Sequence, residues 1–318
     1  MFRRVVITLI LVLMVSGAVV AWFWWREEPK PIGNAYAGMG DISLWDGTGP
    51  VRRQLEALSY GERLVVLNRY SDSAEVRTPR GKIGWVNKGD LIEPAVWQQL
   101  GDLAVKIRAM HAQAVGHTSV LSNVRIGPGV SSPRVGQLRA DTPVEILGRA
   151  VVAQGGGKSP GDNASSARQD WLLVRARAPQ IGQIAGWVFG EFIQDDPPSA
   201  LTPYLSSAGM QPVAWFRLRK VADPSQGPVP NYLMVGTDQP EGSSCDFDML
   251  RVYTWSVRLH QYATAFVQNN LCGRLPVQVT FESGPQKGVL FRFRNVRQGA
   301  SSTLTYRMQD TIVRPVLP

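Results

Sequence analysis

Hydrophobic and polar residues alternate in short runs along most of the chain, and glycine, proline and serine separate the runs. Between about residues 38 and 93 the runs include RLVVLNRY, AEVRT and KIGWVN. A second set extends from about Thr118 to Gln194, and a third, from about 199 to 318, includes VAWFRLRKV, RVYTWSVRLH and VLFRFRNV. Alternation with a period of two over a short run is typical of half-buried strands. The pattern therefore predicts a mainly β protein.

One segment between the first two sets has a different period. Its apolar residues recur at spacings of four and three, at Val96, Leu100, Leu103, Ile107, Met110 and Ala114. This spacing places them on one stripe of a helix. Pro94 precedes the stripe, where the first helical turn leaves its missing N–H without consequence. We therefore expect an amphipathic helix over 94–114 that connects two β modules.

The start of the chain carries a long apolar run. Val5 to Trp25 contain no charged residue. At roughly 1.5 Å per helical residue, a run of this length can cross a hydrocarbon core of roughly 30 Å. Arg3 and Arg4 precede the run, which favours a cytoplasmic N-terminus. The prediction is a single-pass protein of a bacterial inner (plasma) membrane, with residues 1–25 as cytoplasmic stub and transmembrane helix and the bulk of the chain periplasmic or extracellular.

A cleaved signal peptide is the competing interpretation of this run. Val19 and Ala21 fit a small-residue cleavage site, and Ala35-Tyr36-Ala37 reads as A-x-A. The run is longer than a usual signal-peptide core of about 7–15 residues, and the A-x-A lies far beyond its end. Retention is therefore the prediction, with residues 26–37 as an extended tether rich in proline and charge.

The module after the helix matches a known arrangement of motifs. The segment SNVRIGPGVSSPRVGQL (122–138) is followed by TPVEILGRA, DWLLVRA and IAGWVFGEFI. This order resembles the bacterial SH3 (SH3b) family, in which N-V-R-x-G-P, W-x-x-V-R and G-W-V segments close a small β-barrel. The resemblance implies an SH3-like barrel over 115–196. Its alternating apolar residues are expected to fill the interior: Val124, Leu138, Val144, Ile146, Leu172, Val174 and Val188.

Residues 38–93 resemble a divergent second copy of the same family. Gly84-Trp85-Val86 followed by Leu91-Ile92 corresponds to Gly186-Trp187-Val188 followed by Phe192-Ile193. The start has ISLWDGTGP where the family has N-V-R-x-G-P, so a ligand groove built from that segment is not expected here. The fold predicted is thus a transmembrane helix, two small SH3-like barrels joined by an amphipathic helix, and a C-terminal β-rich domain over 199–318. The last third resembles no family, and 154–169, rich in glycine and serine, is predicted to be a mobile loop.

The two cysteines, Cys245 and Cys272, both lie in the last third. An even count in an exported chain favours a disulfide, and such a bridge contributes about 3 kcal/mol by limiting the unfolded chain. Two buried free thiols are the alternative.

Catalytic and metal-binding motifs are weak. An NlpC/P60-type cysteine peptidase needs a thiolate at a helix start and a reachable histidine, whereas Ser244-Cys245-Asp246 precedes a strand-like run and only His260 follows. Three histidines without metal-ligand spacing predict no metal site, and no cofactor is expected. Gly155-Gly156-Gly157-Lys158-Ser159 lacks phosphate-loop spacing. The sequence prediction is that the chain is not an enzyme.

The formal charge of +9 favours an anionic partner, and the expected location excludes nucleic acid. Aromatic and arginine side chains of the 115–196 module could bind peptide or glycan. The candidate ligand-binding residues are Arg125, Trp171, Arg175, Trp187, Phe189 and Phe192. Trp171 and Trp187 also have a packing interpretation, because the family resemblance places them at least partly in the barrel.

Two functions remain open from the sequence. The first is a cell-envelope sensor or adaptor whose SH3b pair binds peptidoglycan or its stem peptides. The second is a structural assembly protein whose modules bind another envelope protein, and a cell-wall hydrolase is third. The sequence does not name the ligand, the oligomeric state or the role of the C-terminal domain.

Overall fold

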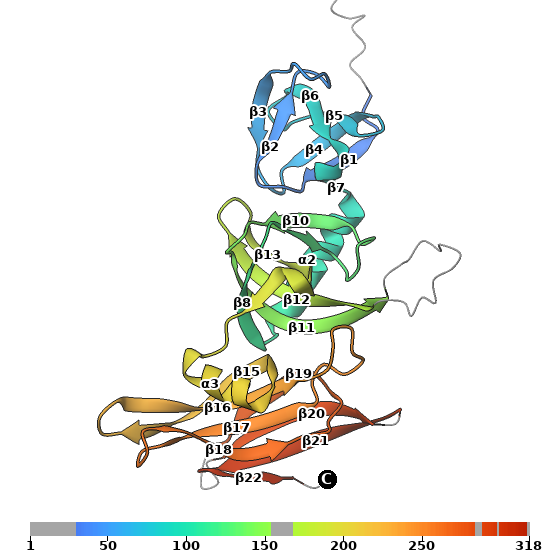
Figure 1. Cartoon of the computed structure of the whole chain (residues 1–318). Coiled ribbons are helices and arrows are strands. Elements are labelled where there is room, and N and C mark those ends of the chain that lie inside the picture. The colour runs from blue at the N-terminus through green and yellow to red at the C-terminus, as the bar shows by residue number, and fades with distance from the viewer. Residues whose placement is uncertain (1–29, 154–167, 284–287, 298, 317–318) are drawn as a thin grey trace, which may run out of the picture. The chain divides into compact units, whose positions relative to one another are not determined.

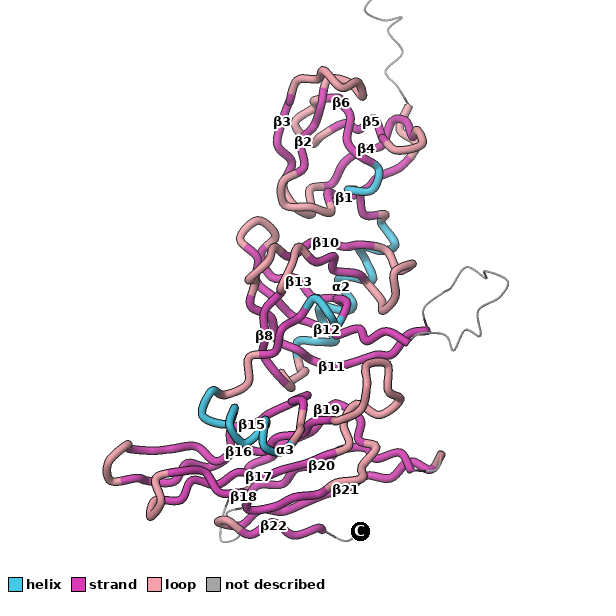
Figure 2. Tube along the Cα trace, viewed as in Figure 1, coloured by secondary structure: helices cyan, strands magenta, loops and turns pink. Residues whose placement is uncertain are grey.

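The computed structural model describes residues 30–153, 168–283, 288–297 and 299–316. These residues are mainly in antiparallel strands, and helix makes up little of the trace (Figure 2). Among them no helix has both the length and the apolar character to cross a bilayer. The transmembrane helix expected at 5–25 lies outside the described residues, as does most of the loop predicted at 154–169.

The chain divides into two compact units. The first holds the described residues up to Ala37 together with Asp41–Glu93, and the second holds Gly38–Gly40 and the chain from Pro94 onward. Every described element and buried cluster lies between residues 30 and 316.

The first unit is one seven-stranded sheet with the order β3-β2-β6-β5-β4-β1-β7. Its elements are β1 Gly33–Ala37, β2 Ile42–Trp45, β3 Gln54–Leu58, β4 Arg63–Arg69, β5 Ser73–Arg77, β6 Ile83–Asn87, a short 3-10 turn η1 Lys88–Asp90 and β7 Leu91–Ile92. The sheet begins earlier than the sequence predicts, because β1 lies in the expected tether. Ala35 and Ala37 are fully buried in it, so small residues supply an alternation that hydrophobicity alone does not reveal.

The second unit opens with helix α2, Pro94–Arg108, which ends before the predicted end at Ala114. Leu100 and Ile107 are its buried residues. The chain then extends, and Ala114 already belongs to β8, because the amide of Gln113 donates to the carbonyl of Ile146 (2.8 Å) and leads the chain into the sheet.

A second seven-stranded sheet follows with the order β10-β9-β13-β12-β11-β8-β14, the order of the first sheet shifted by seven strands. Its elements are β8 Ala114–Thr118, β9 Ser122–Arg125, β10 Arg134–Leu138, β11 Pro143–Ala153, β12 Arg168–Ala178, β13 Gly182–Phe189, η2 Gly190–Phe192 and β14 Ile193–Asp195. Of the predicted interior residues only Leu172 is partly buried, and the others are buried. The two 3-10 turns align Leu91 with Ile193, one residue away from the alignment that the sequence suggests.

The last third consists of two four-stranded antiparallel sheets and a short helix (Figure 1). One sheet holds β15 Gln211–Asp223, β16 Gly227–Thr237, β17 Met249–Ser256 and β18 Gln261–Gln268; the other, called sheet D here, holds β19 Gly273–Phe281, β20 Val289–Arg297, β21 Ala300–Gln309 and β22 Ile312–Pro315. Residues of both sheets form one buried cluster that includes Leu233, Val252, Phe291 and Tyr306. On the other side of the first sheet, η3 Ser199–Leu201 and α3 Thr202–Ala208 pack on Tyr232, Met234 and Tyr253.

A disulfide joins Cys245, in the loop after β16, to Cys272, just before β19. It therefore connects the two sheets of the last third. The predicted alternation in β20 is also present, since Phe291 and Phe293 are buried whereas Arg292 and Arg294 are exposed.

Two polar side chains fasten the second seven-stranded sheet to the last third. Gln113 is buried, accepts from the amide of Val277 through its side chain (2.7 Å) and accepts from the amide of Trp215 through its carbonyl (2.9 Å). Arg149, in β11, donates two bonds to Asp170 of β12 (2.9 and 2.7 Å) and one to Asp246 of the disulfide loop (3.0 Å). Both fastenings lie within the second unit.

The bonds of Arg149 to Asp170 and Asp246 lead to a prediction about the stability of the fold. The Arg149 side chain is 8% exposed and that of Asp246 is 5% exposed. Arg149→Met removes the ion pair of Asp170 and leaves Asp246 with Arg274 as its cationic partner (3.3 Å). The free energy of unfolding is therefore expected to fall by about 3 kcal/mol, the low end for a broken buried pair.

Arg69→Met is the control, because Arg69 is the equivalent residue of the first sheet and pairs with Glu93 at the surface. Their side chains are 31% and 50% exposed. Loss of this exposed pair should cost only about 0–1 kcal/mol. Urea unfolding of both variants measures the difference, and equal losses would contradict the assignment.

Candidate functional site

The aromatic residues predicted to bind a ligand form a packed cluster at one end of the second sheet. Trp171 and Phe189 lie opposite each other on β12 and β13 with ring centroids 5.8 Å apart, and Phe192 meets Phe189 edge-on at 5.1 Å. Trp171 is only 2% exposed. Trp187 packs beside the cluster that α2 covers, together with Leu173 and Ile107. Trp187 and Phe189 are half-buried and Phe192 is 36% exposed, so Trp171 is the ring of this set that packing removes from solvent.

The two predicted arginines are used within the module. Arg125 donates to the carbonyl of Ser132 (2.7 Å), and burial and the nearby Arg134 lower its pKa. Arg175 donates to Glu145 (2.6 Å) and to the carbonyl of Ile107 at the end of α2 (3.2 Å). The six candidates thus take part in ring packing or hydrogen bonds within the second unit, and ligand contact by them stays a prediction.

The equivalence of the two sheets shows where an open groove does exist. Trp85 lies opposite Glu75 in the first sheet, as Trp187 lies opposite Leu173 in the second. Two residues further along these strands, on the same face, Asn87 lies opposite Ser73 and Phe189 lies opposite Trp171. Ser73 and Asn87 therefore occupy the places of Trp171 and Phe189. Where the second module has two bulky rings, the first has two small polar side chains.

The resulting hollow in the first module, called the Trp85 groove here, has a volume of about 540 Å³. It is lined by Thr48, Arg52, Tyr70–Ser73 and Trp85–Asn87. The rings of Tyr70 and Trp85 lie 5.1 Å apart, and Tyr70 is 52% exposed. The guanidinium of Arg52 stands 4.3 Å from the centre of the Trp45 ring, which holds a cation at the edge of the groove. The sequence analysis did not expect a groove built from ISLWDGTGP, yet Thr48 of that segment lines this one. The departure from the family motif hid the groove, and the small side chains that open it leave no motif of their own.

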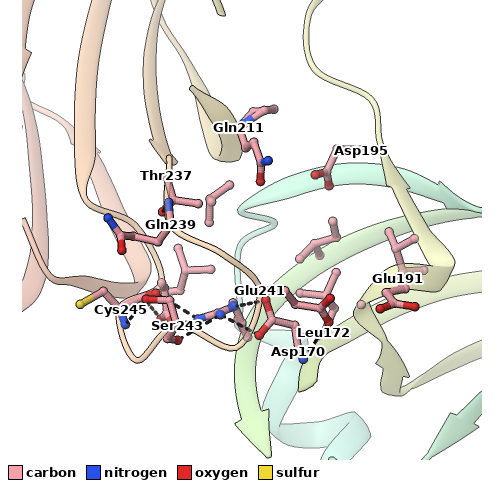
Figure 3. A pocket seen from close by; sticks show the side chains of 18 of the residues that line it. Asp170, Leu172, Glu191, Asp195, Gln211, Thr237, Gln239, Glu241, Ser243 and Cys245 are labelled. Carbon is pink, nitrogen blue, oxygen red and sulfur yellow. Dashed lines mark hydrogen bonds and ion pairs between the residues drawn. The ribbon is translucent and has the colours of Figure 1, made fainter. Parts of the chain in front are cut away.

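A second cavity, of about 520 Å³, lies within the second unit between β11–β14 and the start of the last third (Figure 3). Its walls combine apolar residues such as Leu172, Ile193 and Leu275 with several acids. Arg149 forms part of the wall, and its remaining bonds go to the carbonyls of Ser243 (3.1 Å) and Cys245 (3.2 Å). Asp246 also accepts from the amide of Leu275 (2.8 Å), so this wall is rigidly bonded.

Asp195, an acid of this cavity, has surroundings that differ from those of its counterpart in the first module. The equivalent residue of the first module, Glu93, pairs with Arg69 at 2.7 Å. Arg149 is instead bonded to Asp170 and Asp246, and within the described part of the chain no hydrogen bond or ion pair reaches the Asp195 carboxylate. Asp195 keeps solvent-exposed surface, yet burial of its carboxyl, with the charge of Asp196 beside it, raises its pKa to about 7.

Cys245 and His260 are the groups nearest to the requirements of nucleophilic catalysis, a thiolate or an activated hydroxyl beside a base. Cys245 is bonded to Cys272, so it is not a thiolate in this state. His260 lies near Asp223 (3.2 Å) and Ser225 (3.5 Å), but both contact the same ring nitrogen, Nδ1. The ring therefore does not lie between acid and hydroxyl as a proton relay needs.

Asp223 is explained by its own hydrogen bonds. It accepts from Ser225, Gln226 and the Trp255 indole, and these bonds, the indole first, lower its pKa. In the described ranges no group of three metal-ligating residues is close enough to hold an ion.

Comparison with known proteins gives low structural similarity. No family model matches the chain, and no curated protein matches it. Solved structures that match include an NlpC/P60 family protein from Bacillus cereus ATCC 10987, with 16% identity and a TM-score of 0.22 over 57% of this chain and 64% of that one. NlpC2 and NlpC1 from Trichomonas vaginalis match over 77% of this chain, at 8% and 10% identity and a TM-score of 0.18, covering 99% and 95% of their own lengths. The chain thus spans less than two thirds of the Bacillus protein.

These matches correct one sequence prediction. The chain was expected not to be an enzyme, whereas the solved chains it matches are NlpC/P60 proteins, the family considered above for its cell-wall peptidases. The prediction that the chain is not an enzyme is therefore withdrawn. The TM-scores are too low for the matches to assign an activity, so none is taken from them.

Asp195 gives a pH prediction. Its folded pKa of about 7 lies above the ordinary value of 3.8, so between these values the folded chain binds more protons than the unfolded chain. The free energy of unfolding should therefore fall as pH rises through this window, and Asp195→Asn should flatten the fall. Thermal unfolding from pH 4 to 8 measures it, with Glu191→Gln in the same cavity as a control. An unchanged pH profile in Asp195→Asn would contradict the assignment.

Proposed function

We propose that this chain is a cell-envelope protein built on two SH3b-like modules, and that the Trp85 groove of the first module binds the peptide part of peptidoglycan. The proposal includes the expected location: an N-terminal anchor in the bacterial inner membrane and the modules outside it. The observation that carries it is the open groove beside Trp85, since the equivalent region of the second module is filled by its own aromatic side chains.

The chemistry of the groove supports a peptide ligand. Tyr70 and Trp85 offer apolar ring surface with a polar edge, which suits small apolar side chains and backbone alike. Arg52 and Asp72 line the same hollow and place opposite charges within it. Peptidoglycan stem peptides carry methyl groups, carboxylates and amines, and all three have a complement in this groove. The SH3b resemblance of the sequence points in the same direction.

The second module then has an assembly role. Its aromatic rings pack on one another, α2 covers the cluster beside Trp187, and Gln113 and Arg149 bond the module to the last third. Because the second module packs against the last third, we assign ligand binding to the first module, whose groove is open.

The proposal predicts loss of peptidoglycan binding when the groove is filled or emptied. Ser73→Trp with Asn87→Phe copies the second module into the first and should block the groove, and Trp85→Ala should remove its main ring. Loss of a central aromatic contact costs about 2 kcal/mol or more, which is roughly thirty-fold in Kd. The measurement is co-sedimentation of residues 30–318 with insoluble peptidoglycan, with folding checked by circular dichroism.

Phe192→Ala is the matched control, because Phe192 belongs to the aromatic cluster of the second module and is expected to leave binding unchanged. Binding that survives in the filled variant but falls in Phe192→Ala would move the site to the second module. Absence of sedimentation by the unchanged protein would reject peptidoglycan and favour an envelope protein as the ligand.

A further inference from the structure

Sheet D leaves one of its two faces without a cover among the described residues. Its inner face contributes Phe291, Phe293 and Tyr306 to the buried cluster shared with the neighbouring sheet. The neighbouring sheet is covered on its outer side by α3, whereas the outer side chains of sheet D, such as Arg292 and Arg294, are exposed. Because neighbouring residues of a strand point to opposite faces, the register identifies the whole outer face.

Arginine dominates that outer face. Arg307 and Arg314 lie directly opposite each other on β21 and β22, and Arg292 and Arg294 lie opposite Thr305 and Thr303 on β20 and β21. Like charges directly opposite in an antiparallel pair are destabilising, so the pair of Arg307 and Arg314 is unfavourable for folding alone. Together with Arg292 and Arg294, this pair concentrates positive charge on the outer face of sheet D.

Carboxylates compensate only part of this charge. Arg307 donates to Glu282 (3.0 Å). Within the described residues no ion pair or hydrogen bond engages the side chains of Arg292, Arg294 or Arg314. Their register partners on β19 and β21 are Arg274, Gln278, Thr303 and Thr305. These side chains add hydrogen-bond donors and no negative charge, although Arg274 itself pairs with Asp246 at 3.3 Å.

The same face also exposes aliphatic side chains. Ile312, Arg314 and Val316 alternate along and just beyond β22, and Ile312 and Val316 are 56% and 38% exposed. A hollow of about 400 Å³ is lined by Arg307 and Arg314 together with Ile312 and Val316. Asp310, at the turn before β22, also lines it. Arginine next to exposed aliphatic groups suits a surface that offers phosphate and hydrocarbon together.

We propose that the outer face of sheet D, called the arginine face here, docks on a membrane surface that contains anionic phospholipid. The arginines bind headgroup phosphates, for which the planar guanidinium supplies paired N–H donors. Ile312 and Val316 enter the boundary between headgroups and acyl chains. A soluble polyanion accounts for the arginines but not for the aliphatic pair, which is why a lipid surface is the chosen partner. This inference does not depend on the Trp85 groove.

The test is co-sedimentation of residues 30–318 with phosphatidylcholine vesicles, with and without phosphatidylglycerol. These residues include every described element and omit the segment expected to insert by itself. Binding is expected only with phosphatidylglycerol and should weaken with added salt. The triple variant Arg292→Gln, Arg294→Gln, Arg314→Gln should bind at least roughly ten-fold more weakly. Ile312→Ser with Val316→Ser should weaken binding several-fold.

Arg177→Gln is the matched control, an exposed arginine of β12 outside this face, and should leave binding unchanged. Arg314→Gln by itself should keep or raise the Tm, because it removes the repulsion with Arg307, which separates loss of binding from loss of folding. Equal binding to both kinds of vesicle, or full binding by the triple variant, would overturn the proposal. So would binding that the aliphatic variant retains and that soluble polyphosphate abolishes, since the face would then be a site for a soluble polyanion.

Discussion

Arg149 joins the second seven-stranded sheet to the C-terminal third, and the arrangement of the second unit depends on its bonds. All five of its N–H groups are used: two reach Asp170, one Asp246, and two the carbonyls of Ser243 and Cys245. A buried guanidinium is costly unless its charge and every donor are satisfied, and here two carboxylates and two carbonyls satisfy them. The disulfide fixes the loop that carries three of these acceptors, so the covalent bond and the polar cluster act on the same segment.

The two modules share one strand order but differ at two sets of equivalent residues. Arg69 and Arg149 follow equivalent irregularities in β4 and β11, where the pairing with the next strand shifts by one residue. In the first module the arginine pairs with Glu93 at the surface. In the second module it pairs with Asp246 of the disulfide loop and not with the equivalent residue, Asp195. The aromatic positions differ in the same way, because Trp171 and Phe189 occupy in the second module the space that Ser73 and Asn87 leave open in the first. The first module therefore has a groove at the place where Trp171 and Phe189 pack together in the second.

Sequence reasoning identified what depends on local pattern. The exposed and buried residues of β20 follow from alternation, and the mainly β fold follows from many short runs of that kind. The bond between Cys245 and Cys272 follows from an even cysteine count. The early start at β1 was missed because Ala35 and Ala37 are buried without being strongly hydrophobic. Membrane anchoring stays a prediction, since residues 5–25 are outside the described part.

The candidate site was harder to predict, for two physical reasons. A groove made by small residues is the absence of a side chain, so Ser73 and Asn87 carry no motif, whereas the prominent rings of the second module drew the prediction to Trp171 and Phe189. The partners of Arg149 are distant in sequence, up to 97 residues away, and no periodicity connects them. Such contacts are set by the way sheets meet, which a single sequence does not specify.

The central claim is that the first module carries the ligand groove and the second does not. Hydrogen–deuterium exchange of residues 30–318, with and without soluble stem peptides released from peptidoglycan, tests it most directly, because it reads both modules in one sample. The account predicts slower exchange around Tyr70–Ser73 and Trp85–Asn87, with no change around Trp171–Leu173 and Trp187–Phe189. Protection confined to the second module, or no protection in either at saturating peptide, would contradict it.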